Sequence, residues 1–272
     1  MRKGVVICSP DVEYGPLALL EGSFEEKVKK ASKMGYDGIE LMVRDPALLD
    51  WSWLKGTIED ANLDVPQIVT GELYGADGLS IVTADFNLYR RTVDRVFDII
   101  DLANHLGAMV NIGRLRGRLD NLGTVPNAWE IAVERLNEVA SYAAAKDVRI
   151  ALEPLNRYEA DFILTVEEGM RFIADLQTEN VGLMLDLFHM NIEEPNISES
   201  LCLAGYKLWH VHIADSGRKY PGSGHLDIRS ALNTLITMGY KGYVSAEILP
   251  FPDADTAALK TITYMKMFGD IE

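Results

Sequence analysis

The sequence has little cysteine: only Cys8 and Cys202 occur among 272 residues, and they lie far apart. Two distant thiols form neither a disulfide framework nor a thiol-based zinc site, and the expected location is a reducing compartment, the cytoplasm. Long apolar runs are also lacking. The apolar stretch 5–8 is too short for the core of a signal peptide, and no run is long enough to cross a bilayer. We therefore expect a protein without disulfides and without a membrane segment.

Basic residues are scarce beside acidic ones. The chain has 26 Lys and Arg against 41 Asp and Glu, which gives a formal net charge of −15. Such a surface repels polyanions, so neither nucleic acids nor anionic membranes are expected as partners. The apolar share of 48% and the charged share of 25% are ordinary for a globular protein and exclude a disordered or collagen-like chain. The length is sufficient for a sizeable buried core.

Short apolar runs alternate with stretches of helical spacing along the whole chain. Apolar residues recur at helical intervals at Val93, Val96 and Ile100, and again at Val133 and Leu136. Strands that alternate with helices in this way are typical of parallel βα units. Eight strands are predicted, at residues 4–9, 38–43, 65–70, 108–112, 149–153, 181–186, 208–213 and 242–248.

Local signals mark where some of these helices begin. Ser23 with Glu26, and Thr165 with Glu168, each fit a capping box. In this motif the hydroxyl and the carboxylate satisfy free backbone N–H groups reciprocally. We therefore expect helices to begin immediately after Ser23 and Thr165.

The pattern predicts an α/β fold, a single (β/α)8 TIM barrel that spans residues 1–272. A weak repeat supports it, because MGYDG at 34–38 returns as MGYKG at 238–242, each with a glycine that can end a helix before a strand. An open doubly wound sheet would need a glycine-rich turn after its first strand, and SPDV at 9–12 is not one. Strand-to-helix connections are long and helix-to-strand connections are short. In a barrel, the long connections lie at the C-terminal rim, where the active site is expected.

Each of the last four predicted strands ends on a residue that can bind a metal ion: Glu153, Asp186, His212 or Glu247. Because side chains alternate along a strand, these four face into the barrel mouth. Three carboxylates gathered there would repel one another strongly, and a divalent cation removes this repulsion. Three oxygen donors with one imidazole favour Mn²⁺, Mg²⁺ or Co²⁺ over structural zinc. The sequence therefore predicts one divalent metal ion.

Ordinary explanations exist for each residue taken singly. An acid at a strand end can cap a helix or pair with a basic side chain, but four such residues in register on successive strands favour the metal site. His210 lies one layer deeper than His212 on the same strand face. We interpret it as a hydrogen-bonded core histidine or as a residue that orients a ligand, in preference to a ligand.

The segments around these strand ends resemble a known family. EPLNRYE at 153–159, DLFHMN at 186–191 and the strand ends at His212 and Glu247 are similar to the ketose 3-epimerases of the D-tagatose 3-epimerase type, within the xylose isomerase-like TIM barrel superfamily. The resemblance covers essentially the whole chain and includes the branch of keto-sugar-acid epimerases. It implies a small sugar or sugar-acid substrate, a homo-oligomer (dimer or tetramer), and Mn²⁺ ahead of Mg²⁺ or Co²⁺.

The resemblance also implies roles for individual residues. The four strand-end residues would hold the metal ion. Two of them, Glu153 and Glu247, would also lie on opposite faces of the substrate as the acid/base groups. Three further residues would hydrogen-bond the carbonyl end of the sugar: Glu159, His189 and Arg218.

The chemistry of such a site agrees with an epimerase. A metal ion that binds a carbonyl and the adjacent hydroxyl acidifies the C–H bond between them. One carboxylate can remove this proton to give an enediolate, and a second, on the other face, can return it with inversion. Arg218 would stabilise the charge that develops on the enediolate. We therefore predict C3-type epimerisation of a ketose or keto-sugar acid.

Related activities stay open. An aldose–ketose isomerase of the hydroxypyruvate isomerase type, or an inosose dehydratase, needs much the same metal and carboxylates, and Glu159, His189 and Arg218 together favour epimerisation. A sugar-binding barrel without catalysis would not need two opposed glutamates. The DNA endonucleases of the same superfamily would need histidines at the ends of the third and fourth strands, and segments 68–71 and 111–113 have none.

A basic cluster, RLRGR at 114–118, follows the fourth predicted strand at the active rim. If this segment is extended, Arg114, Arg116 and Arg118 share one side. A solvated loop is the ordinary interpretation. The sharper hypothesis is that one arginine, Arg116, binds an anionic end of the substrate, a carboxylate or a phosphate.

Overall fold

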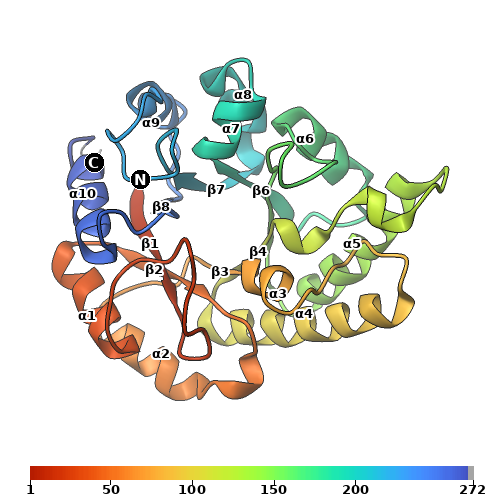
Figure 1. Cartoon of the computed structure of the whole chain (residues 1–272), viewed down its shortest axis with the longest axis horizontal. Helices are drawn as coiled ribbons and strands as arrows, with labels where there is room; N and C mark the ends of the chain where they lie inside the picture. Colours follow the sequence, from red (N-terminus) through yellow and green to blue (C-terminus); the bar gives the residue numbers. More distant parts are fainter. Residues whose placement is uncertain (269–272) are drawn as a thin grey trace.

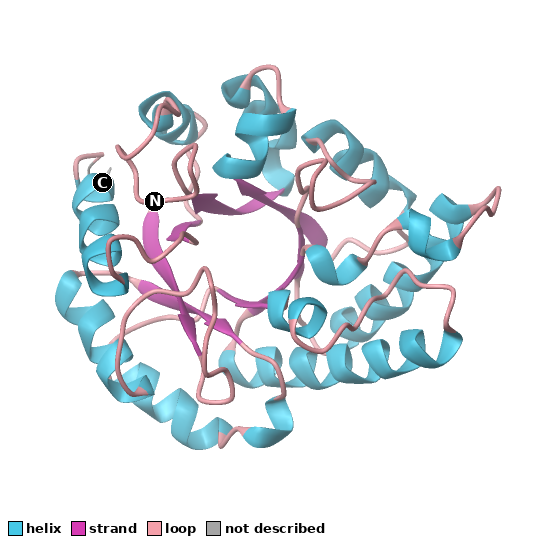
Figure 2. Cartoon of the chain, viewed as in Figure 1, coloured by secondary structure: helices cyan, strands magenta, loops and turns pink. Residues whose placement is uncertain are grey.

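Eight parallel strands form a closed barrel in the computed structural model, which describes residues 1–268 (Figure 1). Each strand pairs with the next along the chain, and β1 (Arg2–Cys8) closes the ring against β8 (Tyr243–Ala246). Figure 2 shows the helices as an outer ring around these strands. The predicted (β/α)8 fold is confirmed.

The other strands coincide with the predicted runs and differ from them only at their ends. Pairing between neighbours is in parallel register throughout, with one irregularity between Leu183 and Met184, where β6 pairs with β7. These strands are β2 (Gly38–Met42), β3 (Gln67–Val69), β4 (Met109–Ile112), β5 (Ile150–Leu152), β6 (Val181–Asp186) and β7 (Leu208–Ile213).

The helices cover the outside of the barrel. They are α1 (Phe24–Met34), α2 (Trp51–Asp60), α3 (Gly71–Gly75), α4 (Phe86–Leu106), α5 (Ala128–Ala145), α6 (Val166–Asp175), α7 (Leu187–Glu193), α8 (Ile197–Ala204), α9 (Ile228–Thr237) and α10 (Ala254–Lys266). Short 3-10 helices add η1 (Pro46–Leu48), η2 (Arg114–Arg116), η3 (Leu119–Leu122) and η4 (Gly205–Lys207). The repeated glycines Gly35 and Gly239 have φ values of 86° and 70°, the left-handed conformation predicted for them.

The two predicted capping boxes form to different degrees. At α1, Ser23 Oγ accepts from Glu26 N at 3.3 Å, and the Glu26 carboxylate accepts from Ser23 N at 2.8 Å, so both halves are present. At α6, Thr165 Oγ1 accepts from Glu168 N at 3.2 Å. The Glu168 carboxylate instead accepts from Leu164 N at 2.7 Å, one residue before the predicted partner. Both helices nevertheless begin where the sequence predicts.

The interior of the barrel holds both apolar and polar side chains. The main apolar core lies between the strands and the surrounding helices, and a small apolar group contains Val6, Cys8, Met42 and Val69 of the first three strands together with Val12 and Ala18. Buried polar residues of β2, β3 and β7 share the interior: Glu40, Gln67, His210 and His212. Because buried polar groups need partners, these side chains mark the part of the interior where a site is expected.

The long connections follow the carboxyl ends of the strands and carry additional short helices. Helix α3 follows β3, and both η2 and η3 follow β4. Helices α7 and α8 lie between β6 and β7. These segments therefore surround the C-terminal mouth of the barrel. Within residues 1–268, no helix combines the length and the apolar character that crossing a membrane requires.

Candidate active site

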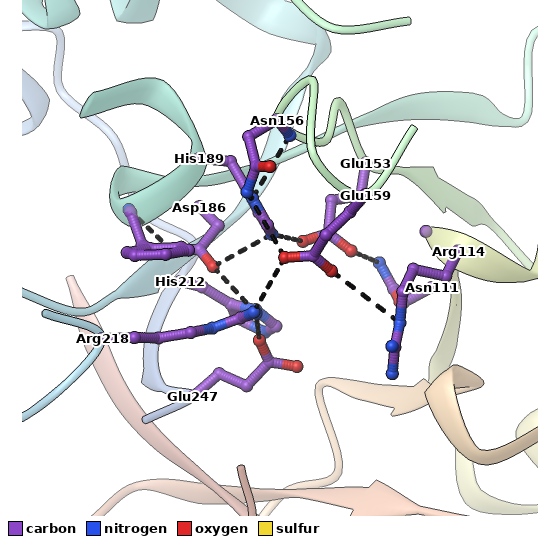
Figure 3. Close-up of polar contacts among 12 residues, drawn as sticks. Asn111, Arg114, Glu153, Asn156, Glu159, Asp186, His189, His212, Arg218 and Glu247 are labelled. Atoms are coloured by element: carbon purple, nitrogen blue, oxygen red, sulfur yellow. Dashed lines mark hydrogen bonds and ion pairs between the residues drawn. The ribbon is translucent and has the colours of Figure 1, made fainter. Parts of the chain in front are cut away.

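The residues at the ends of strands β5–β8 gather at the mouth of the barrel (Figure 3). Glu153 follows β5, Asp186 ends β6, His212 lies near the end of β7, Glu247 follows β8, and all four are buried. One ligand atom each from Glu153, Asp186 and His212 lies within 4.8 Å of the others. Glu247 is adjacent, with its Oε2 3.6 Å from His212 Nδ1. The structure thus brings together the four residues that the strand pattern singled out.

The orientation of His212 is set by a second carboxylate. Its Nε2 lies 3.0 Å from Glu40 Oε2, so this nitrogen carries the proton and Nδ1 faces the cluster. Burial lowers the pKa of His212, but the charges of Glu40 and Glu247 outweigh burial and raise it well above its usual range. The ring therefore also holds a proton at Nδ1 unless a cation takes its place. Within residues 1–268, Nδ1 is buried and has no hydrogen-bond partner.

Glu40 was not predicted from the sequence. It is fully buried on β2, and its two oxygens lie 2.6 Å from His210 Nε2 and 3.0 Å from His212 Nε2. Gln67 Nε2 donates to it at 2.7 Å. His210 is therefore the buried, hydrogen-bonded histidine that was predicted, and it acts on His212 through Glu40. The available signal was a single glutamate within the apolar strand GIELM, whose alternation turns Glu40 into the barrel.

The two glutamates that border the cluster differ in their electrostatics. Burial raises the pKa of Glu153 to about 8, and the charges of Glu247 and Asp186 add to this rise. Burial also raises the pKa of Asp186 to about 6, against the opposing effect of Arg218. For Glu247 burial acts in the same direction, but the charges of His212 and Arg218 outweigh it and lower the pKa to about 2. In the metal-free protein, Glu153 therefore holds a proton at pH values at which Glu247 is ionised. Such a separation of pKa values is typical of acid/base pairs.

Arg218 connects three acids of the site. Its guanidinium donates to Glu247 Oε2 at 2.7 Å and to Glu159 Oε1 at 3.3 Å, and lies 3.5 Å from Asp186 Oδ2. Its backbone has a left-handed φ of 54°, unusual for a residue with a side chain. Backbone hydrogen bonds of 2.7 Å to Asp215 O and from Leu249 N hold this conformation. The fold therefore maintains a strained backbone in order to place one guanidinium between these carboxylates.

His189 presents a neutral ring to the same cluster. The backbone N–H of Asn156 donates to His189 Nδ1 at 3.3 Å, and the Asn156 amide lies 2.7 Å away, so Nδ1 is the acceptor and Nε2 carries the proton. Burial and the Arg218 charge hold the pKa of His189 well below its usual range. Its Nε2 lies 3.7 Å from both Glu153 Oε1 and Asp186 Oδ2. Asn156, which the sequence analysis did not single out, is thus the residue that sets the proton position on His189.

The residues present fit a divalent cation. The carboxylates of Glu153 and Asp186 and the imidazole of His212 point at a common volume, with Glu247 beside them. Burial, with the charges of nearby carboxylates, raises the pKa values of Glu153 and Asp186. The buried Nδ1 of His212 lacks a partner that a metal ion would supply. A set of oxygen donors with one imidazole suits Mn²⁺ or Mg²⁺.

The structure corrects the prediction for Arg116. Residues 114–116 form the 3-10 helix η2, not an extended segment, and the Arg116 side chain is fully buried. Its guanidinium donates at 2.8–3.1 Å to the backbone carbonyls of Gly113, Glu153, Phe162 and Ile163. Burial lowers the pKa of Arg116 to about 10. Because its donors hold loop backbones together beneath the mouth, Arg116 is not placed to bind a substrate anion.

Comparison with known proteins agrees with this fold. Residues 28–266 match the family described as xylose isomerase-like TIM barrel. An L-ribulose 3-epimerase of Mesorhizobium japonicum is 30% identical over 253 residues, which cover 92% of this chain and 84% of the relative. A 3-dehydro-D-guloside 4-epimerase of Escherichia coli is 30% identical over 236 residues, covering 82% and 86%. A solved structure of an L-ribulose 3-epimerase superposes with a TM-score of 0.82 at 26% identity, over 97% of this chain and 93% of that one.

Proposed function

The chain belongs to the xylose isomerase-like TIM barrel family and is an epimerase-type isomerase. From this premise we propose that it is a metal-dependent sugar epimerase. Its reaction would invert the carbon next to the carbonyl of a ketose or keto-sugar acid. The observation that carries the proposal is the pair formed by Glu153 and Glu247. These buried carboxyl groups come from β5 and β8 and flank Asp186 and His212 on the intervening strands.

Glu153, Asp186, His212 and Glu247 would hold the cation. Such an ion, when bound, supplies Lewis acidity to a carbonyl oxygen and a neighbouring hydroxyl. The protein keeps His212 in the required orientation through Glu40, which is bonded to the opposite ring nitrogen. Outer carboxylates of this kind raise the basicity of a ligating histidine.

The two flanking glutamates would move the proton. In the metal-free protein the pKa of Glu247 is lowered to about 2 and that of Glu153 is raised to about 8. A cation held by both would lower the pKa of Glu153 as well, so either carboxylate could take up the proton from its own face of the substrate. Removal of a proton on one face and its return on the other inverts the carbon. A step in the reverse direction exchanges the two roles, as an epimerase requires.

Three further side chains would hold the carbonyl end of the substrate. Arg218 places its positive charge beside Glu247, where it stabilises negative charge on the deprotonated substrate. His189 offers a neutral Nε2–H donor aimed at the cluster. Glu159, held by Arg218 at 3.3 Å, offers an acceptor for a hydroxyl group.

Solvent exchange tests the mechanism. In D2O with Mn²⁺, the wild type should convert a ketose to its epimer and place deuterium at the inverted carbon. Glu247→Gln and Glu153→Gln should each abolish inversion, and one of them should retain exchange, because one base still acts alone. Measured metal content of each variant separates loss of a base from loss of the ion. Full turnover by Glu247→Gln would overturn the proposal.

Product analysis must also identify the reacting carbon. One relative is named as a 3-epimerase and another, at the same identity, as a 4-epimerase. A panel of ketoses and keto-hexonates, with products assigned by NMR, distinguishes the two positions and detects an isomerase or a dehydratase. We also propose that Mn²⁺ is the preferred ion and that the protein forms a dimer or a tetramer. Metal analysis and light scattering test them.

A further inference from the structure

We propose that Arg114 binds the carboxylate of an anionic substrate, so that the protein prefers a keto-sugar acid to a neutral ketose. The inference rests on the proposed function and names its substrate class. It transfers to Arg114 the role that the sequence suggested for Arg116, whose burial excludes it.

Arg114 lies at the mouth, next to the side chains that would surround the reacting carbon. It begins η2, directly after β4. Its Nε is 3.9 Å from Glu159 Oε2, while the other oxygen of Glu159 lies 3.3 Å from Arg218. Figure 3 shows Glu159 between the two arginines. A substrate group bound beside Glu159 would therefore lie within reach of Arg114.

The guanidinium of Arg114 is available for a ligand. Its side chain is 36% exposed, and within residues 1–268 its polar contact is the long ion pair with Glu159, without a hydrogen bond. An ion pair of that length between partly exposed groups contributes little. Glu159 does not depend on it, because Arg218 and Asn156 also donate to this carboxylate. The ring of Tyr74, 5.8 Å from the guanidinium carbon, limits its movement on one side.

The other arginines of the same loop are already engaged. Arg116 is buried on four backbone carbonyls. Arg118 donates to Asp120 at 3.5 Å and lies 3.9 Å from Asp161, so two acids share its charge. Within residues 1–268, Arg114 is the arginine of this cluster whose guanidinium makes no hydrogen bond, and it lies beside Glu159.

The surroundings favour a carboxylate as the ligand. The protein carries a net charge of −15, Glu159 forms an ion pair with Arg114, and Glu72 is close enough for the charge of Arg114 to lower its pKa. An anionic substrate would be repelled by such a mouth unless a cation compensates its charge. The planar fork of arginine matches the two oxygens of a carboxylate. A phosphate, with up to two charges, would need a second cation beside Arg114.

The test compares substrates that differ in one group. D-Tagatose and D-tagaturonate differ only in a terminal CH2OH or carboxylate, and both are assayed with Mn²⁺. The wild type should favour D-tagaturonate in kcat/KM. Arg114→Leu should reduce kcat/KM for D-tagaturonate about 10- to 100-fold, the effect of one charge-assisted pair, and change the value for D-tagatose little. Arg118→Leu is the matched control and should leave the preference intact.

Binding of unreactive analogues makes the result independent of turnover. Calorimetry should show that the wild type binds L-galactonate more tightly than galactitol, and that Arg114→Leu loses this difference. Equal losses on both sugars would assign Arg114 to the positioning of Glu159 and overturn the inference. Preference for D-tagatose or its 6-phosphate would overturn it and leave the proposed epimerase standing. If no sugar shows turnover or exchange, the proposed function fails, and calorimetry still decides the role of Arg114.

Discussion

Replacement of Glu40 by glutamine tests how the barrel interior supports the site. Glu40 is fully buried, with Oε1 2.6 Å from His210 Nε2 and Oε2 shared between His212 Nε2 at 3.0 Å and Gln67 Nε2 at 2.7 Å. All three neighbours act as donors toward it. A glutamine side chain has the same shape, but it offers one acceptor oxygen and one donor nitrogen, so it cannot accept from all three neighbours in the same way.

Either orientation of the new amide leaves a buried donor without an acceptor. If the nitrogen faces His210, that ring must carry its proton on Nδ1, which has no partner within residues 1–268; if it faces the other side, both His212 and Gln67 lose their acceptor. A buried donor without a partner costs about 1–3 kcal/mol of unfolding free energy. His212 also loses the negative charge behind its ring, which should weaken Mn²⁺ binding about 10- to 100-fold.

Two measurements on Glu40→Gln separate these effects. Urea unfolding reports the stability loss, and a calorimetric titration with Mn²⁺ reports the affinity. Glu138→Gln is the matched control, because Glu138 on α5 also accepts from two side chains, Tyr89 and Arg90, but lies outside the barrel. It should lose stability and keep its Mn²⁺ affinity. A folded Glu40→Gln variant with unchanged Mn²⁺ affinity would refute the role assigned to Glu40.

Three further predictions concern other parts of the site. Arg116→Met should lower the unfolding free energy by about 2 kcal/mol or more, since it removes a donor from four buried carbonyls, of which those of Gly113 and Ile163 keep a backbone donor; wild-type stability in urea unfolding would contradict this. Asn156→Leu should reduce kcat roughly tenfold, because it removes the amide beside His189 Nδ1, and metal analysis should find an unchanged ion content. In the metal-free protein, the Glu153 pKa of about 8 lies above the ordinary value of 4.5. The stability that protonated Glu153 contributes is therefore complete below pH 4.5 and is lost as the pH rises through 8. The gain in Tm on adding Mn²⁺ should accordingly grow over this range, and an equal gain at both ends would show that the ion does not bind at Glu153.

The fold and the family were predictable from local patterns. Apolar runs of strand length, separated by amphipathic stretches, placed all eight strands, and glycines such as Gly35 marked helix ends. The four strand-end residues followed from the same reasoning, because the carboxyl ends of parallel strands meet at one rim of a barrel. Their gathering is visible in the structure, while their roles as metal ligands stay predictions.

The partners of these residues were not predictable in the same way. Glu40 reaches His212 across the interior, from a strand that is distant both in the sequence and around the ring. Asn156 was within a recognised segment, but its function depends on how the loop after β5 folds over α7. Arg116 is buried against four backbone carbonyls of loops that meet only in the folded barrel.

By itself, the sequence determined the strand and helix positions, the barrel, and which acids and histidine stand at the strand ends, since these depend on periodicity and on the alternation of side chains. Only the tertiary structure decided which carboxylate orients His212, which arginine remains open to a ligand, and which glutamate holds a proton. These properties arise from contacts between distant strands and from burial, and both exist only once the barrel has closed.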